Sequence, residues 1–84
     1  MKYYKDGFIF EKSKNPNKKY TVYDKNGKRI TSFGARTYQH YFDKIGAFSH
    51  LNHLDKNRRR LYRLRHGTNP KKLSAGWFAL NYLW

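Results

Sequence analysis

The sequence contains no cysteine, and this absence removes two ways of holding a small fold together. Without thiols the chain can form neither a disulfide nor a thiolate metal site, so its core has to come from side-chain packing. The absence fits a reducing compartment without proving one. At 84 residues the chain has room for one small domain with a single thin core.

Long apolar runs are also missing. No stretch approaches the roughly 20 apolar residues that a transmembrane helix needs. The first residues, Met1 to Asp6, lack the apolar segment of a secretory signal peptide. The sequence therefore predicts neither a transmembrane segment nor a signal peptide.

Acidic residues are scarce. Only five are present against 19 Lys and Arg, which gives a net charge of +14; they are Asp6, Glu11, Asp24, Asp43 and Asp55. An excess of this size destabilises a compact monomer through self-repulsion, and ordinary surfaces interleave both signs of charge. The charge balance therefore favours a polyanionic partner, which can be DNA, RNA or an acidic protein surface.

Aromatic residues, in contrast, are abundant, at 19% of the chain. They compensate for the few aliphatic residues because each ring buries a large area. Exposed rings interleaved with Lys and Arg can also stack on single-stranded bases, and Tyr20, Tyr23 and Phe33 would form such a platform. A chain this short of aliphatic residues needs most of its rings in the core, which disfavours that alternative.

Residues 1–17 are predicted to form an N-terminal arm or edge strand, and residues 18–84 a single small basic domain. Gly7 to Lys12 is the strand candidate within the arm, and the loop from Ser13 to Asn17 follows it. The pattern leaves open whether the arm packs on the domain or reaches a neighbour.

A β-hairpin is predicted from Lys18 to Gly34, where two β-branched and aromatic segments flank Asp24-Lys-Asn-Gly27. These four residues suit a type I turn, with Gly27 at positive φ in a bulge. In that register Val22 lies across from Ile30. A two-residue Asn26-Gly27 turn would shift the pairing by one residue, and the sequence is compatible with both.

Three helical segments are predicted after the hairpin. Thr37 to Ile45 has the spacing of a short helix that ends at Gly46. The stretch from Asp55 to Gly67 is a basic helix with a capping residue at each end. The stretch from Leu73 to Trp84 is a helix capped by Ser74 and apolar nearly all round, typical of an element that is buried or held against a partner. The expected fold is α+β: an N-terminal antiparallel hairpin, with a third strand as an option, packed by the basic helix and the apolar C-terminal helix.

The basic helix has two faces when it is wound at 3.6 residues per turn. Leu54, Leu61 and Leu64 fall on one side, which we expect to dock on the domain. The other side and its borders are cationic and are expected to contact nucleic acid, together with two lysines of the following loop; the predicted contacts are Lys56, Arg58, Arg59, Arg60, Arg63, Arg65, His66, Lys71 and Lys72. Exposed aromatic groups of the last helix are the predicted partner contacts: Trp77, Phe78, Tyr82 and Trp84.

The four histidines do not predict a metal or catalytic site. His53 and His66 lie about 20 Å apart if the helix between them is continuous, so they cannot share one ion. His50 and His53 remain a possible pair, but two imidazoles without nearby carboxylates make a weak site, and a metal-dependent nuclease would need them. We therefore predict no cofactor, no metal and no catalytic residue, and expect His53 and Asp55 to organise the start of the basic helix.

The pattern of residues resembles that of a family of short basic proteins from nucleocytoplasmic large DNA viruses of the iridovirus, marseillevirus and mimivirus kind. The resemblance runs from about Tyr20 to Trp84. It is carried by Phe33-Gly-Ala35, by His53-x-Asp55 with Arg58, Arg59, Tyr62 and Arg65-His66, and by Ala75-Gly-Trp-Phe78 with Leu83-Trp84.

This resemblance implies a viral protein carried in the virion, with the host cytoplasm or viral factory as its location during assembly, and no catalytic residues. Together with the charge, it predicts a non-enzymatic virion protein that binds the phosphate backbone of double-stranded DNA without sequence preference. The alternative is a minor capsid or cement protein, held in the virus shell mainly by protein–protein contacts.

Overall fold

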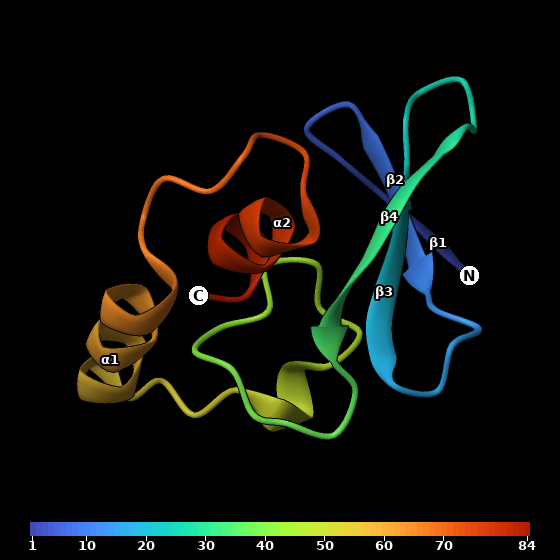
Figure 1. Ribbon diagram of the computed structural model, residues 1–84. Helices are drawn as coiled ribbons and strands as arrows, with labels where there is room; N and C mark the ends of the chain where they lie inside the picture. The colour runs from blue at the N-terminus through green and yellow to red at the C-terminus, as the bar shows by residue number, and fades with distance from the viewer.

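The computed structural model describes residues 1–84 and shows the predicted α+β class, with four strands where two or three were expected. The strands form one antiparallel sheet in the order β1-β2-β3-β4 (Figure 1), so each strand pairs with its neighbour in sequence. The elements in chain order are β1 (Lys2–Lys5), β2 (Phe8–Lys12), β3 (Lys18–Tyr23), β4 (Arg29–Ala35), the short 3-10 helix η1 (Ser49–Leu51), α1 (Lys56–His66) and α2 (Ala75–Tyr82).

The first 17 residues belong to the sheet. They supply β1 and β2, which are joined by a tight turn in which Asp6 and Gly7 both have positive φ. β2 pairs with β1 on one side and β3 on the other, and Phe10 of β2 is fully buried opposite Val22. The N-terminal segment is therefore part of the core and not a free arm.

The hairpin turn between β3 and β4 is confirmed, but its register is shifted. Gly27 has a φ of 87°, and its N–H donates to the Asp24 carbonyl at 2.9 Å. A second irregularity between Val22 and Tyr23 places Val22 across from Thr31. The predicted pairing of Val22 with Ile30 is therefore wrong by one residue, because one extra residue of β4 is accommodated just after the turn.

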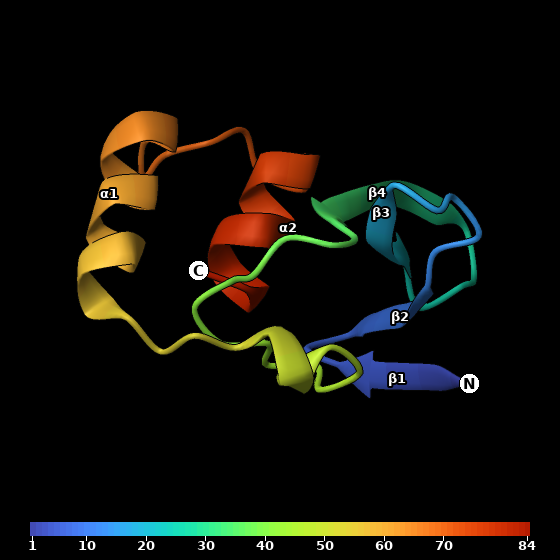
Figure 2. The same ribbon diagram turned by 90° about the horizontal axis from the view of Figure 1, so that it is seen from below.

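The core lies between the sheet and α2, which is the helix nearest to the sheet in both views (Figures 1 and 2). Ser74 caps α2 as predicted, because its Oγ accepts a hydrogen bond from the Trp77 N–H at 3.2 Å. Phe78 stacks on Phe33 of β4 with ring centroids 5.5 Å apart. Such aromatic pairs replace the aliphatic contacts that the sequence lacks.

Gly34 lets the end of α2 approach β4 closely. Its φ is +79°, and a Cβ at this position would lie 2.9 Å from the Leu83 Cδ1 atom. Only glycine has the required backbone freedom without that collision.

The segment from Thr37 to Ile45 is a loop, so the predicted short helix is wrong. The buried carboxylate of Asp43 explains the difference, because it accepts hydrogen bonds from the Ile45 N–H at 2.8 Å and the Phe48 N–H at 2.9 Å. It also accepts from the Tyr20 hydroxyl. These bonds satisfy backbone groups locally and hold the chain in a turn conformation that competes with a helix.

Neither helix combines the length and apolar character needed to cross a bilayer.

Candidate nucleic-acid interface

The ends of the basic helix α1 are where the sequence predicts them. The Asp55 carboxylate accepts hydrogen bonds from the N–H groups of Asn57 and Arg58, at 2.9 and 3.2 Å. His53 supports this cap, because its Nδ1 accepts from the Asp55 N–H at 2.9 Å. Gly67, with a φ of 78°, follows the last turn of the helix. His53 and Asp55 therefore organise the helix start, as expected.

The face by which α1 docks is not the predicted one. Tyr62 stacks on Trp84 with ring centroids 4.2 Å apart and planes only 3° from parallel. Arg59 and Arg63 donate to the backbone oxygen of Trp84 at 2.7 and 3.2 Å. The Arg59 guanidinium also lies 4.9 Å from the centre of the Tyr41 ring. These half-buried groups attach α1 to the short segment that follows α2.

The three leucines that were expected to dock α1 point away from the molecule. Their exposed fractions are 60% for Leu54, 43% for Leu61 and 68% for Leu64. The physical reason is that Trp84 presents a flat ring and a backbone oxygen that accepts hydrogen bonds. Tyr62 and the two guanidinium groups can satisfy that ring and oxygen, and aliphatic side chains cannot.

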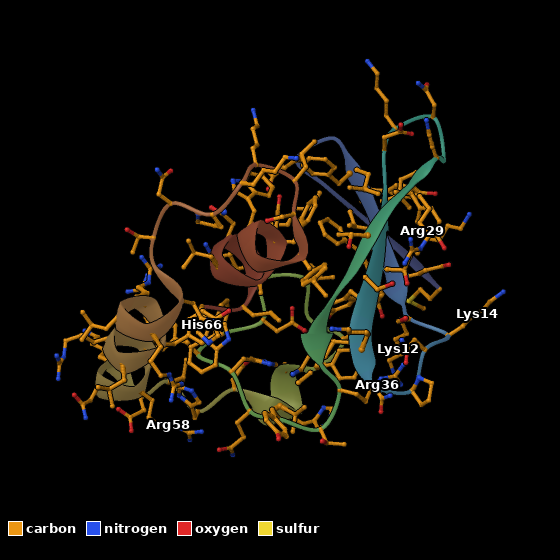
Figure 3. The ribbon with its side chains drawn as sticks, in the orientation of Figure 1. Lys12, Lys14, Arg29, Arg36, Arg58 and His66 are labelled. Carbon is orange, nitrogen blue, oxygen red and sulfur yellow. The ribbon has the colours of Figure 1, made fainter.

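Two cationic flanks border the exposed leucines. At 3.6 residues per turn, Lys56 and Arg60 lie on one flank, and Arg58 and Arg65 lie on the other. All four side chains are exposed. Figure 3 shows Arg58 and His66 on the side of α1 that faces the rest of the molecule. His66 stacks on Tyr62 with ring centroids 4.2 Å apart, so its ring is part of the packing.

A shallow hollow of about 400 Å³ opens beside the first flank. Lys56, Arg60 and the inner arginines Arg59 and Arg63 line it, and no acidic residue does. Four cationic groups around one hollow form a favourable position for a phosphate group, because arginine donates paired hydrogen bonds to phosphate oxygens.

The predicted lysines of the loop, Lys71 and Lys72, are exposed and line a separate hollow with Trp77. Among the predicted partner contacts, Phe78 and Tyr82 are buried against the sheet and have no surface for a partner. Trp77 and Trp84 are half-buried in contacts within the molecule.

A second group of cations lies on the sheet side of the molecule and is absent from the sequence-based prediction. Figure 3 places Lys12, Lys14, Arg29 and Arg36 there. Arg36 has a structural role, because its Nε donates to the Lys18 carbonyl at 2.6 Å. Lys12, Lys14 and Arg29 are exposed. The four cations come from three separate segments of the sequence, so the sequence pattern did not group them.

All five carboxylates accept hydrogen bonds from hydroxyl or backbone N–H groups. Asp6 accepts from the Tyr82 hydroxyl and Glu11 from the Tyr23 hydroxyl. Asp24 and Asp55 accept from backbone N–H groups of their own turn and helix cap. Asp43 accepts from Tyr20 and two backbone N–H groups. The acidic side chains are thus used to build the fold.

The remaining candidates from the sequence are the aromatic platform and the histidines. Tyr20 and Phe33 are fully buried, so they cannot offer a stacking platform for bases. His40 is buried beside Asn52, with its Nε2 2.6 Å from the amide oxygen, and burial lowers its pKa. No three His, Asp or Glu side chains come together in a metal-binding arrangement.

Comparison of the chain with protein-family models, with curated proteins and with solved structures finds no match in any of the three.

Proposed function

We propose that this protein is a small, non-enzymatic, basic virion protein that binds the phosphate backbone of double-stranded DNA without sequence preference. The observation that carries the proposal is the commitment of all five carboxylates to structural hydrogen bonds. The viral context rests on the resemblance over residues 20–84, and it implies a location in the virion or at the site of its assembly.

The cations are distributed in a way that supports this proposal. Of the 19 Lys and Arg side chains, Lys19 is buried, Lys18, Arg36, Arg59 and Arg63 are half-buried, and the other 14 are exposed. Because the carboxylates are occupied elsewhere, these cations keep their charge available for a polyanion. Binding to phosphates releases condensed counterions, so affinity should fall steeply as salt rises.

The outer flank of α1, which carries Lys56 and Arg60, provides the test. We expect the double substitution Lys56→Gln and Arg60→Gln, on the outer flank, to flatten the plot of log affinity against log salt for duplex DNA, by about 0.9 for each phosphate that the variant no longer neutralises. Arg59 and Arg63 are unsuitable for this test, because they hold Trp84 and their removal would disturb the fold. Affinity is measured by fluorescence anisotropy over a series of salt concentrations.

A matched control removes the same charge far from α1. Lys2→Gln with Lys5→Gln changes two exposed cations on β1, at the opposite end of the molecule (Figure 2). This control should retain more of the wild-type slope than the α1 variant. Salt-independent binding, or no binding to duplex DNA at low salt, would refute the proposal.

A second candidate function is a minor capsid or cement protein held by protein contacts, and the exposed leucines favour it. Leu61 and Leu64 form an apolar stripe between two cationic flanks, which fits a protein surface that is apolar at its centre and acidic at its edges. In particles treated with nuclease and high salt, the wild-type protein should stay bound and the Leu61→Ser, Leu64→Ser variant should be released. Release of both proteins would exclude this candidate.

A further inference from the structure

A cavity of about 710 Å³ lies between α1, α2 and the end of β4. Its volume is within the range of about 300–1,000 Å³ that is usual for small-molecule sites. The floor is apolar and includes Ala79 of α2 and Leu83, the residue after α2. This cavity is large for a protein of 84 residues, and the surface that lines it is accessible to a ligand.

The charged groups of this cavity are all cationic. Lys18 and Lys19 of β3 and Arg58 and Arg65 of α1 line it, and none of the lining residues is acidic. Arg58 is held in place, because it donates to the Gln39 side-chain oxygen at 2.8 Å. Lys19 donates to the carbonyl oxygens of Ala35 and Tyr38, which leaves one of its three N–H groups uncommitted.

The other wall is aromatic. It consists of the stack of His66, Tyr62 and Trp84, and the exposed ring of Tyr38 lies at the rim. Aromatic walls favour a planar ring, and the four Lys and Arg side chains favour an anion. Inorganic phosphate would leave the aromatic wall unused, and a fatty acid would leave most of the cations unpaired.

We propose that this cavity binds a nucleoside phosphate, either free or at the end of a nucleic-acid strand, with its phosphate on the cations and its base against the aromatic wall. The proposal is independent of backbone binding by the outer flank of α1, because Lys56 and Arg60 do not line this cavity. It concerns a site for one nucleotide and not the length of a duplex.

Trp84 is a built-in reporter for this site. The chain has two tryptophans, so Trp77→Phe leaves Trp84 as the only one, and Trp84 lines the cavity. In this background we expect adenosine monophosphate to quench the fluorescence in a saturable manner. Adenosine and inorganic phosphate should each bind at least about tenfold more weakly, because each lacks one of the two recognised parts.

Gly76 is a position where a larger side chain can be placed at the cavity wall without changing the charge. It lines the cavity from α2, and a Cβ there would meet only Pro70 and Ser74, at ordinary contact distances of 3.8 and 3.9 Å. We expect Gly76→Leu to abolish saturable binding and Gly76→Ala, the matched control, to retain it. Lys18→Gln provides a second variant and should weaken binding about tenfold. Circular dichroism verifies that each variant is folded.

The outcomes separate this proposal from backbone binding. No saturable quenching in the folded Trp77→Phe protein would overturn it, as would equal binding by Gly76→Leu or by adenosine in the same background. The Gly76→Leu variant should bind duplex DNA with the wild-type salt dependence, so loss of duplex binding in all proteins would refute only the proposed function. Preference for a 5′-phosphorylated over a 5′-hydroxyl oligonucleotide would assign the site to strand ends, and equal affinity would assign it to free nucleotides.

Discussion

The fold buries the charged side chains of Lys19 and Asp43, and both hold backbone groups in place. Lys19 is 1% exposed and donates to two carbonyl groups at the start of the loop after β4. Asp43 accepts from two N–H groups further along the same loop. The two side chains together order a segment that has no regular secondary structure, because they replace the hydrogen bonds that a helix or strand would supply.

Burial of Lys19 makes the stability of the fold depend on pH. It lowers the pKa of the Lys19 ammonium from 10.5 to about 8. Between these two pH values the unfolded chain still holds the proton that the folded protein has released. Unfolding then takes up a proton, and the free energy of unfolding rises with pH.

We therefore expect urea denaturation to show increasing stability as the pH is raised from about 8, and the Lys19→Met variant to lack this increase. Met fills a similar volume without a charge, although the two carbonyl groups lose their donor. The comparison is made below about pH 10, where tyrosines of the unfolded chain begin to ionise. An identical pH profile for both proteins would show that Lys19 is not the titrating group.

At the scale of elements, α1 differs from the other helix because it has no buried residue of its own. Its attachment depends on Trp84, which offers a ring to Tyr62 and a carbonyl oxygen to two arginines. α2, in contrast, is fixed by four buried side chains. The two helices should therefore differ in their local stability.

Replacing Trp84 by Ala should loosen α1 and leave the sheet intact. We expect amide hydrogen exchange in residues 56–66 to accelerate by roughly two- to tenfold, because the lost aromatic pair contributes about 0.5–1.5 kcal/mol beyond its buried area while the backbone oxygen that accepts from Arg59 and Arg63 remains. Exchange in β3 should change little. Trp77→Ala is the control, since Trp77 contacts Phe8 and Phe78 and not α1. Equal effects of both variants on α1 would contradict this mode of attachment.

Sequence patterns predict the ends of α1 but not its docking face. The caps at Asp55 and Gly67 were predictable because they depend on neighbouring residues. The docking face was not, since the periodic leucines indicate an apolar stripe but not whether the protein offers it a partner. The groove beside Trp84 suits Tyr62 and arginine, and its chemistry depends on how distant segments come together. For the same reason the cavity between the helices left no signal in the sequence.

The whole molecule has cationic groups at both of its ends. α1 lies at one end and the outer strands lie at the other, along a long dimension of 37 Å (Figure 2). The composition predicts the size of the charge excess but not this arrangement, because the cations of the sheet side come from separate segments. Mutual repulsion of these groups opposes folding at low ionic strength.

We expect the melting temperature to rise as sodium chloride is added at low total ionic strength, because the salt screens repulsion between cations. The Lys2→Gln, Lys5→Gln, Arg60→Gln and Arg65→Gln variant, with four fewer exposed charges, should show a smaller rise. Differential scanning fluorimetry over a salt series measures the melting temperatures of the wild-type protein and of this variant. A melting temperature that is constant or falls with salt would show that self-repulsion is not a significant term.

The position of α2 in the chain affects how the protein is made. The strands pair with their sequence neighbours and can assemble as translation proceeds, but the helix that covers Phe10, Tyr20 and Phe33 begins at Ala75. Until that helix leaves the ribosome, the nascent sheet exposes its aromatic face to other chains and to chaperones. Translation that stops short of residue 75 would therefore yield an aggregation-prone sheet instead of a smaller folded protein.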